Sequence, residues 1–479
     1  MVPEELRNAE SQLPKHIYVD LDGTLTPCDT LWEQVARLIR RKPFYLLLLP
    51  FVLLRGRARF KSSLIQWTQV NVATLPFRTA LVSWLQSQQT AGRRVILATA
   101  SHDLTAHAVV KHLGLDGYLA TDQDKNLKGA AKADAVKRHA NGEPFVYVGD
   151  SSADIPVWRE ATVAIAINNA KDLNRANTEN RHNWLFEQHS LRHAVRALRP
   201  HHWAKNALLF VPLITAHQFV DWRPWLACAV AFLSFSFMSS AVYLVNDLMD
   251  LEADRQHPRK KNRPLAQGSL SIPIALVLTL AVFLTSAGLA YFLPLGFGQL
   301  LALYAVMTTL YSLAVKQIVV IDTITLAALF TMRVLAGGAA SGTPISPWLL
   351  AFSMFVFLSL AMLKRYIELI TLKEQDAKAA AGRGYLVGDA PMVAALGVAN
   401  GSVSVLVLAL YVNSPEVALL YANPMGIWLI CPALIYWLSR LWMRAHRSQM
   451  HDDPLVFAFS DPVSYAVGIF VLAVMWLAL

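Results

Sequence analysis

From Asn206 onward the chain consists largely of long stretches without charged residues, and this feature restricts its fold more than any other. No charged residue occurs between Arg263 and Lys316, a length that suits two helices crossing a bilayer as a hairpin. We therefore predict an all-α polytopic membrane domain of about nine transmembrane helices, of which the first and last are short. The apolar segments lie near 206–220, 223–246, 270–292, 295–314, 319–338, 346–363, 391–412, 417–439 and 463–479.

The basic residues are distributed unevenly among the connections between these segments. Connections rich in lysine and arginine stay in the cytoplasm, so we expect an integral inner-membrane protein whose N-terminal region and long polar loops are cytoplasmic. The opposite connections contain Arg223 and almost nothing else basic. The basic set consists of Arg196, Arg199, Lys205, Arg255, Arg259, Lys260, Lys261, Arg263, Lys316, Lys364, Arg365, Lys373, Lys378, Arg440, Arg444 and Arg447.

Bulk properties exclude several other classes of protein. The net charge of +10 is explained by the basic loops, so we expect the lipid bilayer, and no nucleic acid, as a partner. The three cysteines are far apart, which indicates neither a disulfide framework nor a cysteine metal site. The first ten residues, MVPEELRNAE, contain no apolar run, so no cleaved signal peptide is expected. A homo-oligomer is left open.

The first 200 residues have ordinary charge density and alternate apolar runs with helical patterns. Three runs have the character of parallel strands: HIYVDLD (16–22), RRVILATA (93–100) and PFVYVGD (144–150). Each ends on a small or acidic residue and is followed by a helix-like stretch. An α/β domain of this kind binds its ligands at the carboxyl ends of the strands.

The residues at these strand ends form a set suited to phosphoryl transfer. Asp20 and Asp22 leave the first strand two positions apart, so both carboxylates converge on one site. The set supplies a carboxylate nucleophile, a second carboxyl as acid or base, acidic ligands for Mg²⁺, and a cation and a hydroxyl for phosphate oxygens. Its other members are Thr99 with Ser101 close by, Lys132 (or, less favoured, Lys128), Asp150 and Asp154.

In order and spacing these motifs resemble the haloacid dehalogenase superfamily, through DLDGT, LATAS, Lys132 and GDSSAD. The resemblance implies a Rossmannoid α/β phosphatase domain over about 14–190, with a substrate-selecting cap at about 30–90. It implies Asp20 as nucleophile, Asp22 as general acid/base, and a Mg²⁺ site formed by Asp20, Asp22 and Asp150, with Asp154 as a further ligand. The alternative is a catalytically inactive relative that serves as a docking module.

Residues 44–54, FYLLLLPFVLL, are almost wholly apolar, yet eleven residues are too few to span a bilayer. Two interpretations stay open: a buried cap helix, or a helix on the membrane surface whose basic flanks face anionic lipid. The flanking residues are Arg40, Arg41, Lys42, Arg55, Arg57 and Arg59.

An aspartate-rich motif follows the second apolar segment. On a continuous helix Asp247, Asp250 and Asp254 would share one face, where three like charges repel and need a cation such as Mg²⁺, which usually also binds substrate phosphates. The basic residues that follow could hold phosphate oxygens, the arginines as bidentate forks. The alternative is a solvated positive loop. The basic residues are Arg255, Arg259, Lys260, Lys261 and Arg263.

A second polar group follows the fourth apolar segment. An arginine inside an apolar span needs a partner, and for Arg333 we expect Asp322, eleven residues earlier on the same helix face. This pair could be purely structural. Tyr311, Ser312 and Lys316 precede it, and Lys364, Arg365 and Glu368 form a weaker group that could equally be interfacial anchors.

The motif NDLMDLEAD, the following loop and the YSxxxK…D segment resemble the UbiA-type prenyltransferase superfamily over about 195–479. Within it, three blocks look like the decaprenyl-phosphate phosphoribosyltransferases. The blocks are LRPHHWAKNALLFVPL (198–213), YLVNDLMDLEADRQHPRKKNRPLAQG (243–268) and YSLAVKQIVVIDTITLAALFTMRVLAGG (311–338). Where the superfamily often has a second aspartate-rich pair, this chain has only Asp322, which argues against ordinary prenyl transfer.

The resemblance implies Mg²⁺-dependent transfer of 5-phosphoribose from phosphoribosyl diphosphate to a polyprenyl (decaprenyl) phosphate. We predict that the phosphatase domain then removes the 5-phosphate, which gives polyprenyl-phosphoryl ribose. The alternatives are an aromatic prenyltransferase that uses a polyprenyl diphosphate beside an unrelated phosphatase, and a transporter or lipid-binding scaffold. Catalysis and metal binding are assigned to Asp247, Asp250 and Asp254. Substrate binding is assigned to Thr99, Lys132, Lys205, Asn246, Arg255, Lys260, Arg263, Tyr311, Lys316, Asp322 and Arg333.

Overall fold

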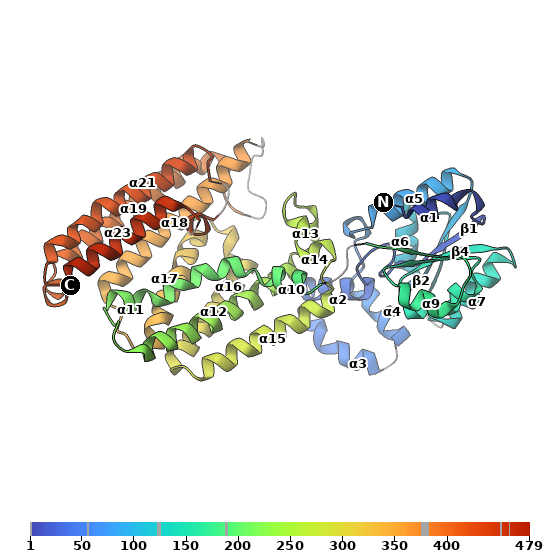
Figure 1. Ribbon diagram of the computed structural model, residues 1–479, viewed down its shortest axis with the longest axis horizontal. Helices are drawn as coiled ribbons and strands as arrows, with labels where there is room; N and C mark the ends of the chain where they lie inside the picture. Colours follow the sequence, from blue (N-terminus) through green and yellow to red (C-terminus); the bar gives the residue numbers. More distant parts are fainter. Residues whose placement is uncertain are drawn as a thin grey trace. The chain divides into compact units, whose positions relative to one another are not determined.

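The computed structural model describes residues 2–54, 57–121, 126–186, 190–374, 383–450, 453–458 and 460–479 (Figure 1). The chain forms two compact units. The first consists of Met1–Ala197 and Leu244–Leu278, and the second of Leu198–Tyr243 and Thr279–Leu479. We expected a single boundary, between 190 and 195. The structure instead groups residues 244–278, called the aspartate-rich segment below, with the N-terminal domain.

A parallel six-stranded sheet in the order β3-β2-β1-β4-β5-β6 forms the centre of the first unit. The three strands expected from the sequence are present as β1, β2 and β4, and β1 lies between the other two. Their carboxyl ends therefore meet at one edge of the sheet. The strands are β1 (His16–Val19), β2 (Arg94–His102), β3 (Gly117–Thr121), β4 (Phe145–Gly149), β5 (Val163–Ile167) and β6 (Arg181–Trp184).

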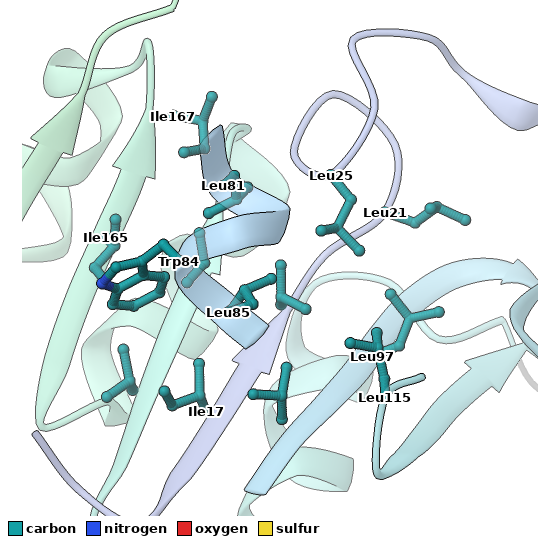
Figure 2. Packing of buried hydrophobic residues seen from close by; sticks show 14 of the residues in the cluster. Ile17, Leu21, Leu25, Leu81, Trp84, Leu85, Leu97, Leu115, Ile165 and Ile167 are labelled. Carbon is teal, nitrogen blue, oxygen red and sulfur yellow. The ribbon is translucent and has the colours of Figure 1, made fainter. Parts of the chain in front are cut away.

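Helices cover both faces of this sheet, which explains why its strands are apolar on both sides. Figure 2 shows one face, where Trp84 and Leu85 of α5 pack with Ile17 of β1 and Ile165 of β5. On the other face Tyr18 packs with residues of α7, α8 and α9. The N-terminal helices outside the cap are α1 (Glu4–Asn8), η1 (Glu10–Gln12), α5 (Thr79–Thr90), α6 (Asp103–Leu113), α7 (Ala130–Ala140), η4 (Ser152–Asp154), α8 (Ile155–Glu160), α9 (Ala170–Ala176) and α10 (Leu191–Leu198).

A helical insertion after β1 forms the cap. Val35, Leu38 and Leu64 make a small apolar cluster of its own. The cap is shorter than the expected 30–90, because α5 packs into the main core and not with the cap helices. Its elements are α2 (Thr30–Arg41), η2 (Pro43–Leu48), α3 (Leu49–Leu54), α4 (Arg57–Trp67) and η3 (Val72–Thr74).

The apolar run at 44–54 is not buried in the cap. Phe44 is 82% exposed, Phe51 66% and Leu54 87%. The first interpretation, a buried cap helix, is therefore wrong for these side chains. Of the flanking basic residues, Arg55 lies outside the described residues.

The aspartate-rich segment is not one continuous helix. The helix α12 (Trp222–Met249) ends before Asp250, whose φ of −96° and ψ of 12° depart from helical values, and α13 (Leu251–Gln256) begins after it. The expected common helix face of three aspartates is therefore broken. The segment continues through η6 (Lys260–Asn262) and α14 (Pro264–Gln267) into the first turns of α15 (Ile272–Tyr291).

Seven helices among the described residues are long and apolar enough to cross a membrane. The uncharged stretch between Arg263 and Lys316 forms two of them, as expected, and a helix of 17 residues follows near the C-terminus. The seven are α12, α15, α16 (Leu295–Leu313), α17 (Ile321–Ser341), α18 (Pro347–Glu374), η8 with α19 (Val387–Val412), and η9 with α21 (Pro424–His446); the shorter helix is α23 (Pro462–Ala478).

The count of nine is approximate because the segment expected at 206–220 is divided. It consists of the end of η5 (Pro200–Phe210), a 3₁₀ helix, and of α11 (Val211–Thr215). Pro212 lies in the first turn of α11, where a missing N–H is tolerated. The combination of an α/β domain and a helical membrane domain is confirmed. Short elements complete the second unit: η7 (Val315–Gln317), α20 (Pro415–Leu420) and α22 (Pro454–Ala458).

Candidate active sites

A buried lysine joins the acidic residues at the carboxyl edge of the sheet. Lys132 Nζ donates to Asp20 Oδ2 at 2.7 Å and to Asp154 Oδ1 at 3.0 Å. Tyr147, from β4, donates its hydroxyl to the same Asp154 oxygen at 2.7 Å. Lys132 is only 2% exposed, so water screens its charge little. The charge therefore acts on Asp20, on Asp154 and on any group that binds beside them.

A glycine turn brings Asp150 against the loop that follows Asp20. Gly23 has a φ of +76°, which disfavours other residues, and a Cβ built there would lie 2.1 Å from Asp150 Oδ2. Thr24 donates its hydroxyl to Asp150 Oδ1 at 3.2 Å. Gly23 and Thr24 of the DGT motif therefore fit the close approach between the ends of β1 and β4.

The buried carboxylates at this edge fit a magnesium ion. Ligand oxygens of Asp20, Asp150 and Asp154 lie within 4.8 Å of one another. Burial, followed by the charge of Asp154, raises the pKa of Asp150 to about 7. Burial raises the pKa of Asp20 to about 8 against the opposing effect of Lys132. An all-oxygen cluster with this excess of negative charge is the donor set that Mg²⁺ prefers.

Among the residues that the structure describes, Asp22 is not part of the carboxylate group formed by Asp20, Asp150 and Asp154. The resemblance to the haloacid dehalogenase superfamily had placed it among the metal ligands. Its Oδ1 accepts the backbone N–H of Thr30 at 2.8 Å, and its Oδ2 accepts the hydroxyl of Ser101 at 2.7 Å. The Asp22 carboxyl is thus held at the start of the cap helix α2. This position suits a proton donor to the leaving group better than a metal ligand.

Of the two hydroxyl residues that end β2, Ser101 and not Thr99 lines the cavity over this site. Thr99 is fully buried, and its Oγ1 accepts the backbone N–H of Ser101 at 3.0 Å. In this structure the Thr99 hydroxyl supports the loop that presents Ser101, and contact of Thr99 with phosphate stays a prediction.

A cavity of about 590 Å³ opens over Asp20 and Lys132. Cap residues such as Trp32 and Lys61 line part of it. Residues of the aspartate-rich segment line another part, namely Leu265, Leu270, Ser271, Ile272 and Pro273.

Ion pairs connect the aspartate-rich segment to the cap. Both terminal nitrogens of Arg255 donate to the carboxylate of Glu33 on α2, at 2.9 and 2.6 Å, and both side chains are buried. Arg37 pairs with Glu252 at 3.2 Å in a more exposed position. The expectation that Arg255 grips substrate phosphate is not supported in this arrangement, because Glu33 occupies its fork.

Two of the three predicted magnesium-binding aspartates in this segment lie together. Arg263 NH1 contacts Asp247 Oδ1 at 3.0 Å and Asp254 Oδ2 at 2.5 Å. Burial and the charge of Asp247 raise the pKa of Asp254, although Arg263 opposes the shift. Asp250 lies outside this contact.

The other residues predicted near these aspartates lie around them. Lys260 Nζ is 3.9 Å from Asp254 Oδ1. The carbonyl of Asn246 accepts the N–H of Asp250 at the end of α12. Two carboxylates from different helices, one shared arginine and a nearby lysine form a group that fits a cation together with an anionic ligand.

In the second unit Lys205 has a carboxylate partner that the sequence did not reveal. Asp453 Oδ2 accepts from Lys205 Nζ and from Lys364 Nζ, each at 2.7 Å. Burial would raise the pKa of Asp453, but the two lysines outweigh it and hold the pKa far below the ordinary value.

The expected pairing of Arg333 with Asp322 is wrong. Arg333 donates to Asn206 Oδ1 at 2.9 Å and to the hydroxyl of Tyr304 at 3.1 Å. Asp322 instead lies 2.7 Å from Arg365 NH2, and Tyr385 donates to its other oxygen. Eleven residues along one helix correspond to roughly 16 Å of rise, so sharing a face does not bring two side chains into contact.

The remaining predicted residues of the second unit lie near this buried pair. The hydroxyl of Tyr311 accepts from Arg383 NH1 at 3.3 Å, and Arg383 also donates to Glu368. Lys316 lies in η7, immediately before α17. Arg365 is fully buried, so it is not an interfacial anchor.

The residues that sequence reasoning missed are partners rather than motif members. Glu33 lies 222 positions from Arg255, and Asp453 lies 248 positions from Lys205. No periodicity links residues so far apart. Of these missed partners, only Arg365 gave a signal in the sequence. It is a charged residue at the end of an apolar segment, and such a charge requires a partner.

Comparison with known proteins gives two family matches. Residues 207–461 match the UbiA prenyltransferase family, and residues 17–159 match the haloacid dehalogenase-like hydrolases. An uncharacterized protein of Sinorhizobium fredii is 34% identical over 455 residues, covering 94% of this chain and 88% of that protein.

Shorter matches add detail. A decaprenyl-phosphate phosphoribosyltransferase of Corynebacterium glutamicum is 37% identical over 188 residues, covering 38% of this chain and 57% of that protein. The solved structure of a UbiA homolog from Archaeoglobus fulgidus bound to DMAPP and Mg²⁺ is similar to 59% of this chain and 98% of that chain, with 16% identity and a TM-score of 0.46.

Proposed function

The chain belongs to the UbiA prenyltransferase family and carries a haloacid dehalogenase-like phosphatase domain in its N-terminal part, and on this premise we propose that it is a bifunctional membrane enzyme. Its first activity transfers 5-phosphoribose from phosphoribosyl diphosphate to a polyprenyl phosphate. Its second activity removes the 5-phosphate and yields polyprenyl-phosphoryl ribose. The similarity to decaprenyl-phosphate phosphoribosyltransferases supports the first step.

The transfer step needs charge stabilisation more than proton transfer. An oxygen of the lipid phosphate, already ionised, attacks C1 of the ribose, and the bond from C1 to the diphosphate oxygen breaks with its electron pair. Asp247 and Asp254 would hold Mg²⁺, which would neutralise the charge that develops on pyrophosphate. Arg263 lies between the two carboxylates, and on metal binding it would turn to the diphosphate oxygens.

The hydrolysis step follows from the contacts around Asp20. Lys132 holds the Asp20 carboxylate in place for attack on phosphorus. As the phosphorus–oxygen ester bond breaks, the Asp22 carboxyl gives its proton to the leaving oxygen, which becomes the 5-hydroxyl of the ribose. Water then hydrolyses the aspartyl phosphate and releases inorganic phosphate and the Asp20 carboxylate. Mg²⁺ held by Asp20, Asp150 and Asp154 would neutralise the phosphate oxygens. Lys132 and Ser101 are placed to bind those oxygens.

The proposed coupling of the two steps rests on which segments of the chain make up the first unit. The aspartate-rich segment, which lies within the residues that match the transferase family, packs into one compact unit with the phosphatase domain. A product that stays in the bilayer would meet the phosphatase at high effective concentration. The exposed apolar run at 44–54 supports contact of the cap with the membrane surface.

We also propose the orientation that the basic loops indicate, with the phosphatase domain and both active sites on the cytoplasmic side of the inner membrane. The two sites would then face the same compartment, which the coupling requires.

Mass spectrometry of the lipid product tests the proposal. Purified protein is incubated with labelled phosphoribosyl diphosphate and decaprenyl phosphate in detergent. The wild type should give polyprenyl-phosphoryl ribose, and Asp20→Asn should accumulate the 5-phosphorylated lipid because the nucleophile is removed. If both give the same phosphorylated lipid in equal amounts, the coupling is refuted. If labelled polyprenyl diphosphate is consumed and phosphoribosyl diphosphate is not, the transfer assignment fails.

A further inference from the structure

The cavity over Asp20 is larger than a phosphate group requires. Its volume of about 590 Å³ lies within the range of sites that enclose whole small molecules. The acidic residues and Lys132 account for the phosphate end. The leaving group of the phosphate ester must therefore contact the rest of the lining, which includes residues far along the chain.

Residues 265–273 are held firmly against the phosphatase domain. Leu265, Leu270 and Ile272 are 2%, 3% and 5% exposed. Gly268 has a φ of +79°, and a Cβ built there would lie 2.6 Å from Pro27 Cγ. In the same unit, Arg255 donates through Nε to the carbonyl of Ala266 and through its terminal nitrogens to Glu33.

We propose that residues 265–273, which lie within the region matching the transferase family, are the substrate-selecting wall of the phosphatase. Leu265, Leu270, Ile272 and Pro273 supply its apolar surface, and Ser271 supplies a hydroxyl. The substrate class is a sugar phosphomonoester whose leaving group carries a second substituent that rests on this wall.

The position of the wall indicates what that substituent is. Ile272 and Pro273 begin α15, a helix long and apolar enough to cross a bilayer. A leaving group on this wall therefore sits within one helical turn of the start of a spanning helix. We assign the substituent as the anomeric phosphodiester of a lipid-linked sugar, an identification that rests on the proposed function; the wall itself rests on the cavity alone.

The first test of the wall is an increase in specificity. It is measured as a ratio of two kcat/KM values, which does not depend on how much folded protein a variant yields. Ser271→Lys adds a cation beside the leaving group and should raise kcat/KM for ribose 1,5-bisphosphate about fivefold relative to ribose 5-phosphate, as a single partly exposed ion pair would. Ile274→Lys is the matched control, because Ile274 is 47% exposed and is not among the residues that line the cavity. Release of the 5-phosphate by the full-length protein in detergent is the measurement.

A loss of specificity tests the same wall from the other direction. Ser271→Trp fills part of the cavity and should lower kcat/KM for the lipid-linked 5-phosphoribose about tenfold or more, while p-nitrophenyl phosphate, with its single ring, is retained. Ile274→Trp should change neither. An unchanged substrate ratio in both Ser271 variants, or a ratio that changes equally in the Ile274 controls, overturns the proposal.

Failure of the wall and failure of the proposed function give different results. If the Ser271 variants shift the ratio of the two soluble sugar phosphates, the wall stands even when Asp20→Asn accumulates no lipid intermediate. If Asp20→Asn accumulates the intermediate but no Ser271 variant shifts a ratio, the coupling stands and the wall is refuted.

Discussion

Removal of the Glu33 carboxylate should destabilise the first unit strongly, because it leaves a buried arginine without its counter-ion. Glu33 and Arg255 have side chains only 7% and 6% exposed and form two short hydrogen bonds. Burial would lower the pKa of Arg255, but Glu33 outweighs it and raises the pKa above its ordinary value. Breaking such a pair from one side costs about 3–5 kcal/mol, whereas replacing both partners with uncharged groups is often nearly neutral.

The measurement is the temperature at which the phosphatase loses activity toward p-nitrophenyl phosphate after brief heating, which reports on the first unit alone. For a domain of about 150–250 residues, 1 kcal/mol corresponds to roughly 2–4 °C, so Glu33→Gln should lower the midpoint by about 6–20 °C. The double variant Glu33→Gln/Arg255→Met should recover most of this loss. Glu252→Gln, which removes the more exposed pair with Arg37, should cost about 1 kcal/mol or less.

Two results would refute this reasoning. A Glu33→Gln variant as heat-stable as the wild type would mean that the pair is solvated or not formed. A double variant as unstable as the single one would mean that packing, and not the uncompensated charge, sets the loss.

Three further predictions concern the metals and the topology. Asp247→Asn should lower transfer by about 10²-fold or more, as loss of a stabilising group in the transition state does, and should leave hydrolysis of a soluble sugar phosphate intact; equal loss of both activities would contradict separate sites. The pKa values of Asp20 and Asp150 are raised to about 8 and 7, chiefly by burial, so the folded state binds these protons more tightly than the unfolded state and metal-free stability should fall as pH rises from about 5 to 8. Heat inactivation in EDTA should therefore occur at a lower temperature at pH 8 than at pH 6, and Mg²⁺ should protect more at pH 8. The change of inactivation temperature with pH should be smaller in Asp20→Asn. An inactivation temperature that rises from pH 6 to pH 8 in EDTA would contradict this prediction. Cysteine at Lys261 should label from the cytoplasm and cysteine at Ser346 from the other side, since three spanning helices separate them; labelling of both from one side refutes the topology.

The sequence predicted the elements whose signals are local. Strands β1, β2 and β4 were predicted because apolar runs ending in Asp20, Thr99 or Asp150 have a strand's length and composition. Strands β3, β5 and β6 were not predicted. Gly117–Thr121 and Arg181–Trp184 are short and partly exposed, whereas Val163–Ile167 is buried but does not end in an acidic or hydroxyl motif residue. The motif order alone identified Asp20, Lys132 and Asp150, which the fold brings together.

Long-range pairings could not be predicted in the same way. The partner of Arg333 was misassigned because a shared helix face was taken as contact, whereas Asn206 reaches it from another element. The break at Asp250 was missed because the sequence NDLMDLEADR has good helix formers on both sides of it. The placement of residues 244–278 depends on packing with the cap, which no local pattern encodes.

Gly268 is a position at which the two modules constrain each other's evolution. At this position even an alanine would press on Pro27, a residue of the other functional module. A transferase without an attached phosphatase has no such neighbour and can accept a side chain there. Once the two modules share this contact, a change on one side limits the changes that the other tolerates, so we expect Gly268 and the loop at Pro27 to vary together in fused relatives and independently where the modules are encoded by separate genes.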